Sequence, residues 1–530
     1  MPPPTPLPDA GPWTFEILEA DGTGHGGIDF QCSQLVWELN GMGGGSGYCA
    51  ALEATLAPLF SSGRFNDGLE VGVYHDGTFL RSILPSPRQR AAPTSPVVMD
   101  LGGTGFPYGL RRRFVGRLNE TPNLIINGAF QTDIGGWTTF GGASAAWDAA
   151  TGPDANPGVA ELSLSSVGVG GIFQDSIPVG GLPFDTFLWI TAWCNIDPAV
   201  ADYMVPPDGG GIVILLHSGA TFLWQQAATP DWRIKGVWQR VRMKVYLPGG
   251  LGAVDLLVQL RTPENVIQWD QVVVHQEERL YAAGDPGTII SLLVTHAQDT
   301  SIGKTDLFIN TDTARSGYSG GFTTVRAYKY SGRANILSAM NEFAGIDGGV
   351  DWVGEQPARN TRTIFVYDPQ GYEPPGGREA LVLGDNIQSY EWVWSTDDHA
   401  DRCIAMGRGD GFEVDEGVAI DAGSPDLGWE QLKPAQIEAV NDTQATAEGM
   451  LQLAAQPVIL RVTVQRTETF DPVELCKGDG PILPARLVDV TLVEGQVDLT
   501  NVGMKIVKTA LSPEAHTAQL DLVHLPSTLS

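Results

Sequence analysis

The stretch "NLIINGAFQTDIGGW", residues 123–137, looks like the start of a separate protein, although it lies inside a chain of 530 residues. The composition changes after it. Residues 122–278 hold eight of the 14 tryptophans, and their short apolar runs are separated by turn residues without any helix-period segment. This pattern predicts a β-sandwich or jelly roll. We therefore interpret the chain as a host protein that carries an inserted sandwich.

The host is also expected to be rich in strands. A chain of 530 residues is too long for one hydrophobic core, so several domains are expected. Glycine (65) and proline (36) are frequent, and aromatic and β-branched residues recur in short alternating runs. The predicted fold class is mostly β with some α+β: two β-barrels, an α+β region and the inserted β-sandwich.

The expected domain order follows from these changes in pattern. It comprises a proline-rich N-terminal arm at 1–11, a first barrel at 12–121, the sandwich at 122–278, an α+β region at 279–425, and a helix with a second barrel at 426–530. Within the first barrel, Asp76-Gly77 predicts a hairpin turn, because this dipeptide tolerates positive φ. The glycine-rich run at 41–47 is interpreted as a mobile loop.

Four helices are expected in the host. Asp285-Pro286 is typical of a helix start, since aspartate caps and proline suits the first turn. A second helix is expected over "GRANILSAMNEFAG", residues 332–345, and shorter ones before Pro58 and after Asp442. The apolar faces of the first two helices are assigned to Ile289, Leu292, Leu293 and His296, and to Ile336, Met340 and Phe343.

Charge and cysteine content exclude several functions. The chain has 62 acidic against 32 basic residues, a net charge of −30 that repels phosphate backbones. The basic run "LRRRFVGR" at 110–117 is interpreted as a strand with a solvated basic face. The five cysteines are scattered without a C-x-x-C pair, so we expect reduced, buried thiols rather than zinc ligands. Without a signal sequence or a long apolar run, synthesis in a cytoplasm and no membrane insertion are expected.

The order of four host motifs resembles a known family. The motifs are "WELNGMG" (37–43), "EVGVYHDG" (70–77), "DPGTIISLLVTHAQ" (285–298) and "NIQSYEWVWSTDDHADRCIAMGRGDG" (386–411), followed by the closing barrel. In this order the host resembles the tail-hub (baseplate-hub, minor tail) proteins of long-tailed bacteriophages, particularly those infecting actinobacteria. The resemblance implies a structural virion protein at the tail tip. In that family, two barrels from each of three subunits alternate in a ring around the genome channel.

The same resemblance implies the partners. They are two further copies in a homotrimer, the distal tail protein, the tape-measure protein, and a central fibre or other minor tail proteins. Genome DNA would pass through the ring without specific binding, which suits a strongly acidic protein. No catalytic residue and no cofactor are implied.

The insert resembles carbohydrate-binding jelly-roll modules. The matching positions are Asn123, Leu124, Asn127, Phe130, Gly136 and Trp137. In that family a glutamate after the Phe and a late aspartate, here Asp270, help to hold a structural calcium ion. This sequence has Gln131 in place of the glutamate, and a neutral amide weakens the case for calcium, which prefers anionic oxygens.

Flat aromatic rings would carry sugar binding, because they stack on pyranose C–H groups. The candidates are Trp147, Trp193, Trp224 and Trp232, with host cell-wall polysaccharide as the partner. The alternative for each is a place in the sandwich core. Trp189 and Trp238, inside strong strand patterns, are assigned to the core.

Two other functions remain open from the residues. One is a free-standing carbohydrate-binding adhesin, which would explain the insert but not the host. The other is a glycoside hydrolase with an appended binding module, which needs two carboxylates about 5 to 10 Å apart. The acidic cluster Asp397-Asp398-His399 with Asp401 is a candidate, but it lies between two strands, where a solvated polar turn is expected.

Overall fold

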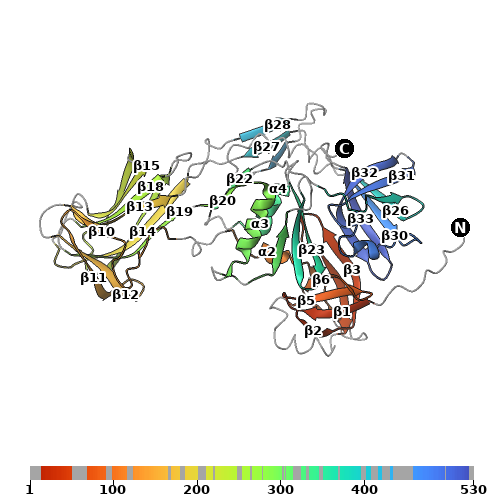
Figure 1. Ribbon diagram of the computed structural model, residues 1–530, viewed down its shortest axis with the longest axis horizontal. Helices are drawn as coiled ribbons and strands as arrows, with labels where there is room; N and C mark the ends of the chain where they lie inside the picture. Colours follow the sequence, from red (N-terminus) through yellow and green to blue (C-terminus); the bar gives the residue numbers. More distant parts are fainter. Residues whose placement is uncertain are drawn as a thin grey trace. The chain divides into compact units, whose positions relative to one another are not determined.

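The computed structural model describes most of the chain as two compact units, drawn in Figure 1. Unit 1 comprises residues 1–115, 281–326 and 334–530, and unit 2 comprises residues 116–280 and 327–333. The finer division into five segments stays a prediction. The described residues are 13–50, 69–86, 88–90, 98–115, 123–164, 169–179, 186–200, 210–218, 221–247, 254–262, 266–276, 278–300, 304, 306–313, 324–329, 334–344, 350–367, 371–394, 402–406, 416–420, 430–433, 458–495 and 497–524.

Unit 1 begins with a group of mainly antiparallel strands. Their order in the sheet is β2-β1-β5-β6-β9-β4-β3, and β8 pairs with both β4 and β7. The strands are β1 (Trp13–Leu18), β2 (Gly24–Gly27), β3 (Phe30–Glu38), β4 (Gly44–Ala50), β5 (Glu70–His75), β6 (Thr78–Pro85), β7 (Arg88–Arg90), β8 (Val98–Asp100) and β9 (Gly103–Thr104).

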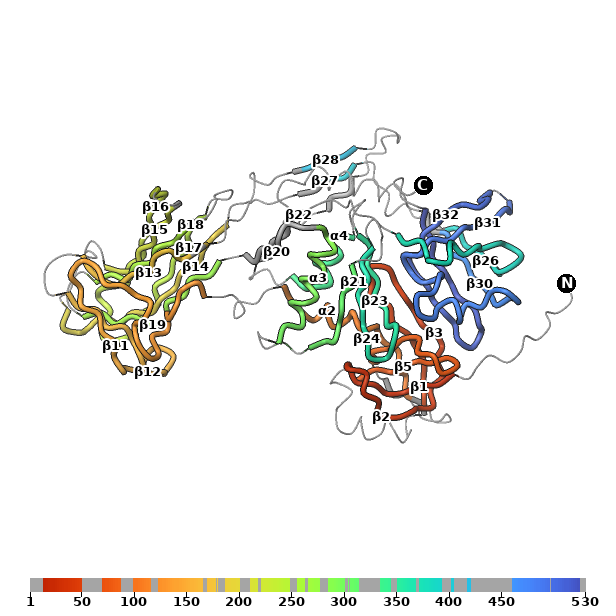
Figure 2. The backbone as a smooth tube through the Cα atoms, viewed as in Figure 1, coloured from red at the N-terminus to blue at the C-terminus, as the bar shows by residue number. Residues whose placement is uncertain are grey.

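The C-terminal strands continue the same sheet. β3 pairs antiparallel with β32, and the order runs on as β32-β33-β30-β26, while β31 pairs with β32 and β25. Figure 2 colours the two ends of the chain red and blue, so that both can be followed. The elements are β25 (Glu379–Val382), β26 (Ile387–Trp394), β30 (Val458–Gln465), η5 (Glu474–Cys476), β31 (Leu487–Glu494), β32 (Val497–Ser512) and β33 (Thr517–His524).

The β3–β32 pairing is held by a shared apolar core. Leu35 lies opposite Leu511, and Trp37 lies opposite Thr509. Leu35, Trp37 and Leu511 are buried in one core that includes residues of both strand groups. Among the described residues no sheet closes on itself, so the strands expected in two barrels share one open sheet and one core. The mostly-β fold class is confirmed.

Unit 1 also contains helices and small sheets, and the strands β20 and β22 each include residues of both units. β21 runs parallel to β24, and β23 runs antiparallel to it. β20 pairs with β22, and β27 lies between β28 and β29. The elements are α2 (Tyr108–Arg111), β20 (Glu278–Gly284), α3 (Pro286–Ala297), β21 (Ile309–Asp312), β22 (Thr324–Lys329), α4 (Ile336–Ala344), β23 (Asp351–Ala358), β24 (Thr361–Tyr367), β27 (Arg402–Met406), β28 (Glu416–Ile420) and β29 (Glu430–Lys433).

Unit 2 is a sandwich of two antiparallel sheets around one core, as the sandwich-type pattern predicts. Sheet I has the order β10-β13-β18-β15-β16, and sheet II has the order β11-β12-β19-β14-β17. The strands are β10 (Thr138–Phe140), β11 (Ser144–Thr151), β12 (Pro157–Ser163), β13 (Gly170–Val179), β14 (Thr186–Ile196), β15 (Gly211–Ser218), β16 (Thr221–Ala228), β17 (Trp238–Leu247), β18 (Val254–Thr262) and β19 (Ile267–Gln276).

Local signals in the sequence predicted several elements correctly. Asp76 and Gly77 both have positive φ in the turn between β5 and β6. Asp285 caps α3 by accepting a hydrogen bond from the Thr288 backbone N–H at 2.9 Å. The expected faces of the two helices are buried, except that Leu292 of α3 is exposed. The helices expected before Pro58 and after Asp442 lie outside the described residues.

Two segments differ from expectation. Only the first part of the glycine-rich run, residues 41–43, lies outside a strand: residues 44–47 belong to β4, where the glycines leave room for neighbouring atoms to contact the strand. A Cβ at Gly47 would lie 2.2 Å from the Phe30 ring and 2.3 Å from the Gln31 carbonyl oxygen. Over its described residues, 110–115, the basic run is not a strand. It starts in α2, whose Leu110 is buried, and afterwards Phe114 makes a single bridge to Asn335.

The five cysteines are all buried thiols outside any disulfide, as expected. Burial raises the pKa of the Cys32 and Cys194 thiols to about 12, so both are unreactive thiols at neutral pH. In the part of the chain that the structure describes, no helix has the length and apolarity needed to cross a membrane.

Candidate functional site

The hairpin β23–β24 in unit 1 is joined to the C-terminal strands by a buried arginine. Arg486 is fully buried, and its Nη1 donates to Glu355 at 2.6 Å and to the Tyr367 hydroxyl at 2.8 Å. Its Nη2 donates to Asp479 at 2.5 Å. Burial alone would lower the pKa of Arg486, but the negative charges of Glu355 and Asp479 outweigh it and raise this pKa. Nη1 also donates to the Pro484 carbonyl oxygen at 2.8 Å, so the guanidinium is a permanent cation that binds four acceptors.

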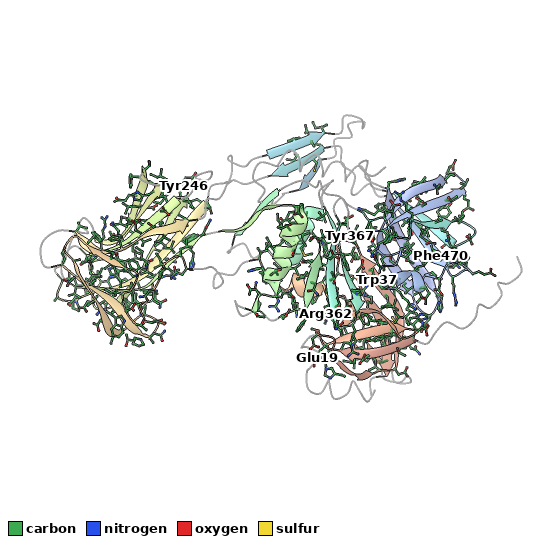
Figure 3. The ribbon with its side chains drawn as sticks, in the orientation of Figure 1. Glu19, Trp37, Tyr246, Arg362, Tyr367 and Phe470 are labelled. Carbon is green, nitrogen blue, oxygen red and sulfur yellow. The ribbon has the colours of Figure 1, made fainter. Side chains whose placement is uncertain are left out.

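A second buried contact joins the same hairpin to the N-terminal strands. Arg362 of β24, labelled in Figure 3, pairs with Glu70 of β5 at 2.8 Å. Ser82 of β6 donates its backbone N–H to Gln356 of β23 at 2.7 Å, and its hydroxyl donates to Glu70. Glu70, Ser82 and Arg362 are all buried. The contact therefore fixes β5 and β6 to the hairpin. Because its polar side chains are buried, they cannot reach a substrate.

A third contact joins β32 and the end of β3 to the hairpin. Lys505 of β32 pairs with Asp351 of β23 at 2.8 Å, and both are buried. Asn40 donates to the Asp351 carboxylate at 3.1 Å and accepts from the Trp352 backbone N–H at 2.7 Å. We name these three groups the hairpin contacts: Arg486–Glu355, Arg362–Glu70 and Lys505–Asp351. Since removing one partner of a buried pair is strongly destabilising, they act as fixed structural joints.

The surface of the shared sheet offers a small polar cavity of about 250 Å³. Arg461, one of the two cations in its lining, is already paired with Asp521 at 2.8 Å and with Glu391 at 3.1 Å. A cation satisfied by two carboxylates has little left to offer an anionic ligand. The cavity is lined by Gln34, Arg461, Lys508, Ala510, Gln519 and Asp521.

The four candidate tryptophans of unit 2 are not brought together. Trp147 lies on β11, at the edge of sheet II, and its indole N–H donates to the Phe130 carbonyl oxygen at 2.7 Å. Trp193 lies on β14 of the same sheet, between buried Ala192 and Cys194, so its ring faces away from the core. Trp224 lies on β16 of sheet I, and its ring packs partly against the core. Trp232 is 2% exposed in the core, where its ring face cannot meet a sugar.

The outer face of sheet II carries a set of aromatic and basic side chains that the sequence patterns did not reveal. Trp189 was assigned to the core, yet it is 41% exposed, because it alternates with buried Leu188 and Ile190. Its ring faces Lys244, whose ammonium lies 5.2 Å from the Trp189 ring centroid. Trp238, also assigned to the core, is only half-buried, and its indole N–H donates to Thr151.

The same face continues along β14 and β17. The Lys244 ammonium lies 3.8 Å from the Phe187 ring centroid, and Phe187 packs edge-on against Tyr246 at 5.8 Å. Figure 3 labels Tyr246, which is 46% exposed. A signal in the sequence could have found this face: in "RVRMKVY", residues 240–246, every second residue is basic or aromatic.

The residues around Asp270 do not fit a calcium ion. Asp270 is 1% exposed, and its carboxylate accepts from the Gln271 backbone N–H at 2.7 Å. Gln131 is exposed and neutral, and the nearby Asp154 already accepts from the side chains of Asn156 and Gln271. In the described part of the chain, no cluster of three or more His, Cys, Asp or Glu residues is placed to hold a metal. The buried Asp270 supplies one carboxylate, whereas calcium is held by about six to eight oxygen ligands.

Burial raises the pKa of Asp270 to about 7, and the nearby Asp154 charge adds to this, while the Gln271 hydrogen bond opposes it. At neutral pH this carboxyl is therefore partly protonated. The acidic cluster at Asp397, Asp398, His399 and Asp401, considered for glycoside hydrolysis, lies outside the described residues.

No protein-family model and no curated protein matches the chain. Among solved structures, it is similar over 97% of its length to a 43 kDa tail protein of prophage MuSo2 from Shewanella oneidensis, with 98% of that chain covered, 9% identity and a TM-score of 0.43. It is similar over the same share to a tail protein from Neisseria meningitidis MC58, with 96% of that chain covered, 10% identity and a TM-score of 0.40.

A part of the chain is similar to a different class of protein. The CBM22-1 xylan-binding domain from Paenibacillus barcinonensis matches over 29% of this chain and 95% of its own, with 11% identity and a TM-score of 0.23. Both of these full-length structural neighbours are thus tail proteins, the first of them from a prophage, and the partial one is a xylan-binding domain. Because all three TM-scores are below 0.5, these likenesses are remote and carry no inference about function.

Proposed function

We propose that the chain is a structural protein of a bacteriophage tail. The observation that carries this proposal is the way unit 1 is held together: the two ends of the chain share one sheet through β3 and β32, and three buried ion pairs fix the β23–β24 hairpin to both. These pairs are satisfied internally and give the unit stiffness rather than chemistry. The order of the host motifs in the sequence supports the same class.

Within the tail, we place the protein at the tip, as a homotrimeric hub ring that joins the tail tube to the tip or central fibre. Such a ring needs stiff segments whose outer strands contact neighbouring subunits. The net charge of −30 suits the wall of a genome channel, because it repels the DNA phosphates. Its partners would be the distal tail protein, the tape-measure protein and other minor tail proteins.

Unit 2 would face outward from this ring and contact host cell-wall polysaccharide. Three copies of an insert of this size cannot share a channel with a DNA duplex roughly 20 Å across, a width that follows from its groove dimensions. The exposed rings on the outer face of sheet II, Trp189 and Tyr246, supply the aromatic surface that sugar stacking needs.

Electron cryomicroscopy of the intact particle tests the placement. We expect density for three copies around the tail axis at the tip, with unit 2 pointing outward. Six copies, one copy, or density elsewhere in the virion would contradict the proposed ring. The non-enzymatic role is tested by incubating the purified protein with peptidoglycan and arabinogalactan. Turnover that a single carboxylate substitution abolishes would show that the protein is a hydrolase instead.

A further inference from the structure

The outer face of sheet II concentrates positive charge in a unit that is otherwise acidic. Residues 116–280 contain 16 acidic and eight basic residues, and five of the basic ones lie between 233 and 244. Arg240, Arg242 and Lys244 occupy alternate positions of β17, so all three project from the same face and all are exposed. Their spacing along the strand is about 7 Å, twice the rise per residue.

Each of these cations lies opposite a residue of β14 on the same face. Arg240 is opposite Trp193, Arg242 is opposite Thr191, and Lys244 is opposite Trp189. On the other side of β14, Trp189 is opposite His275 of β19. The result is a stripe of aromatic rings flanked by basic groups. We call this set, Phe187, Trp189, Trp193, Arg240, Arg242, Lys244 and Tyr246, the aromatic–basic stripe.

The two arginines differ from the lysine in what they contact. Lys244 lies over the rings of Phe187 and Trp189 and helps to fix their orientation. In the part of the chain that the structure describes, neither Arg240 nor Arg242 has an ion-pair partner, unlike Arg233, which pairs with Asp231 at 2.8 Å. Two unpaired guanidiniums beside exposed rings can each bind a planar carboxylate through two N–H groups.

We propose that the aromatic–basic stripe binds an acidic, carboxylate-bearing polysaccharide, with the rings of Trp189 and Trp193 stacking on the sugars and Arg240 and Arg242 pairing with the carboxylates. This rests on the glycan contact proposed above and names its face and its ligand class. Nucleic acid is the other polyanion that two guanidiniums could bind, and it is therefore one of the probes in the test.

The test uses the full-length protein and three probes: polygalacturonate as the acidic glycan, xylan as a neutral glycan, and a single-stranded DNA oligomer. Isothermal titration and affinity electrophoresis measure binding at low and high salt. We expect polygalacturonate to bind more tightly than xylan, with an affinity that falls as salt rises, since charge pairs at a surface are screened. The double substitution Arg240→Gln with Arg242→Gln should weaken this binding by at least tenfold, a change about equal to 1.4 kcal/mol.

The matched control, Arg233→Gln with Arg261→Gln, removes two positive charges of the same unit away from the stripe and should leave the affinity unchanged. Trp189→Ala provides a second variant that tests stacking without changing charge, and unchanged thermal unfolding shows that each variant is folded. Absence of polygalacturonate binding, or equal losses in the control, overturns the proposal, as does tighter binding of DNA. Equal binding of xylan overturns the acidic ligand class but leaves the glycan contact standing, whereas failure to bind either glycan removes that contact as well.

Discussion

At the scale of single residues, the buried carboxyl of Asp270 makes the stability of unit 2 depend on pH. Its pKa in the folded protein is about 7, above the ordinary value of 3.8, mainly because burial disfavours the charged form. A group with a raised pKa binds its proton more tightly in the folded state. Its contribution to stability is therefore complete below about pH 4 and is lost as pH rises through about 7.

We predict that Asp270→Asn removes this dependence. Calorimetry of the full-length protein should show one unfolding transition that this substitution shifts. In the wild type, the temperature of that transition should be higher at pH 5 than at pH 8, and the free energy of unfolding should be larger at pH 5 by on the order of a few kcal/mol. The variant should show a flatter profile, whereas Asp154→Asn should keep most of the pH dependence, because the Asp154 charge contributes less than burial does to the raised pKa of Asp270. Equal pH profiles for wild type and Asp270→Asn would contradict the prediction. If calcium added at pH 8 raises the unfolding temperature of the wild type and Asp270→Asn abolishes this increase, the site binds calcium.

The tryptophans show why side-chain placement was hard to predict from the sequence. In "FLWITAWC", residues 187–194, nearly every residue on both faces is apolar, so the alternation does not reveal which side is the core. The structure places Leu188, Ile190 and Ala192 inside and Trp189 outside. β17 is different, because its basic residues alternate with buried ones and mark the outer face directly.

At the scale of elements, the glycines of β4 are the feature that sequence patterns misplace. Hydrophobic periodicity cannot identify a strand in which three of the first four residues are glycine, and glycine is ordinarily disfavoured in strands. Here Gly47 is required, because a Cβ would clash with the Gln31 carbonyl oxygen of the neighbouring strand. By contrast, α3 was predictable, since its aspartate cap, its proline and its apolar spacing all act locally.

We predict that Gly47→Ala destabilises unit 1 by about 1 to 3 kcal/mol, the typical cost of overpacking in a core. Chemical denaturation of the full-length protein measures this change. The control is Gly376→Ala, because a Cβ there meets no atom within 4 Å. If both substitutions have the same small effect, β4 is not packed against Phe30 and Gln31 as described.

At the scale of the whole molecule, the pairing of β3 with β32 joins segments from opposite ends of the chain. No local pattern encodes such a pairing, so the sequence predicts the strands but not the sheet they share. The three hairpin contacts stabilise this arrangement, and they too join residues that are distant in sequence.

We predict that breaking one hairpin contact destabilises unit 1 far more than breaking an exposed ion pair. Arg486→Met leaves Glu355 buried without its cation and should cost about 3 to 5 kcal/mol. Arg461→Gln, which removes a partly exposed pair on the same sheet, should cost less than about 1 kcal/mol. Denaturant unfolding compares the two variants. Adding Glu355→Gln to Arg486→Met should recover part of the loss, and absence of any recovery would mean that the cost arises from packing alone.

The last prediction concerns the insert. Unit 1 has its own core, made from residues before and after the insert, and unit 2 has a separate one. Replacing residues 122–278 with a short Gly/Ser linker should therefore leave unit 1 folded, since a closed loop costs little entropy and the core contacts are kept. The shortened protein should be soluble. It should lose the calorimetric transition of unit 2, which Asp270→Asn shifts in the full chain, and keep the transition of unit 1, which Arg486→Met shifts. Insoluble product, or loss of both transitions, would show that the insert is needed for the host to fold. A folded product also supplies the control for glycan binding, because it should bind neither polygalacturonate nor xylan.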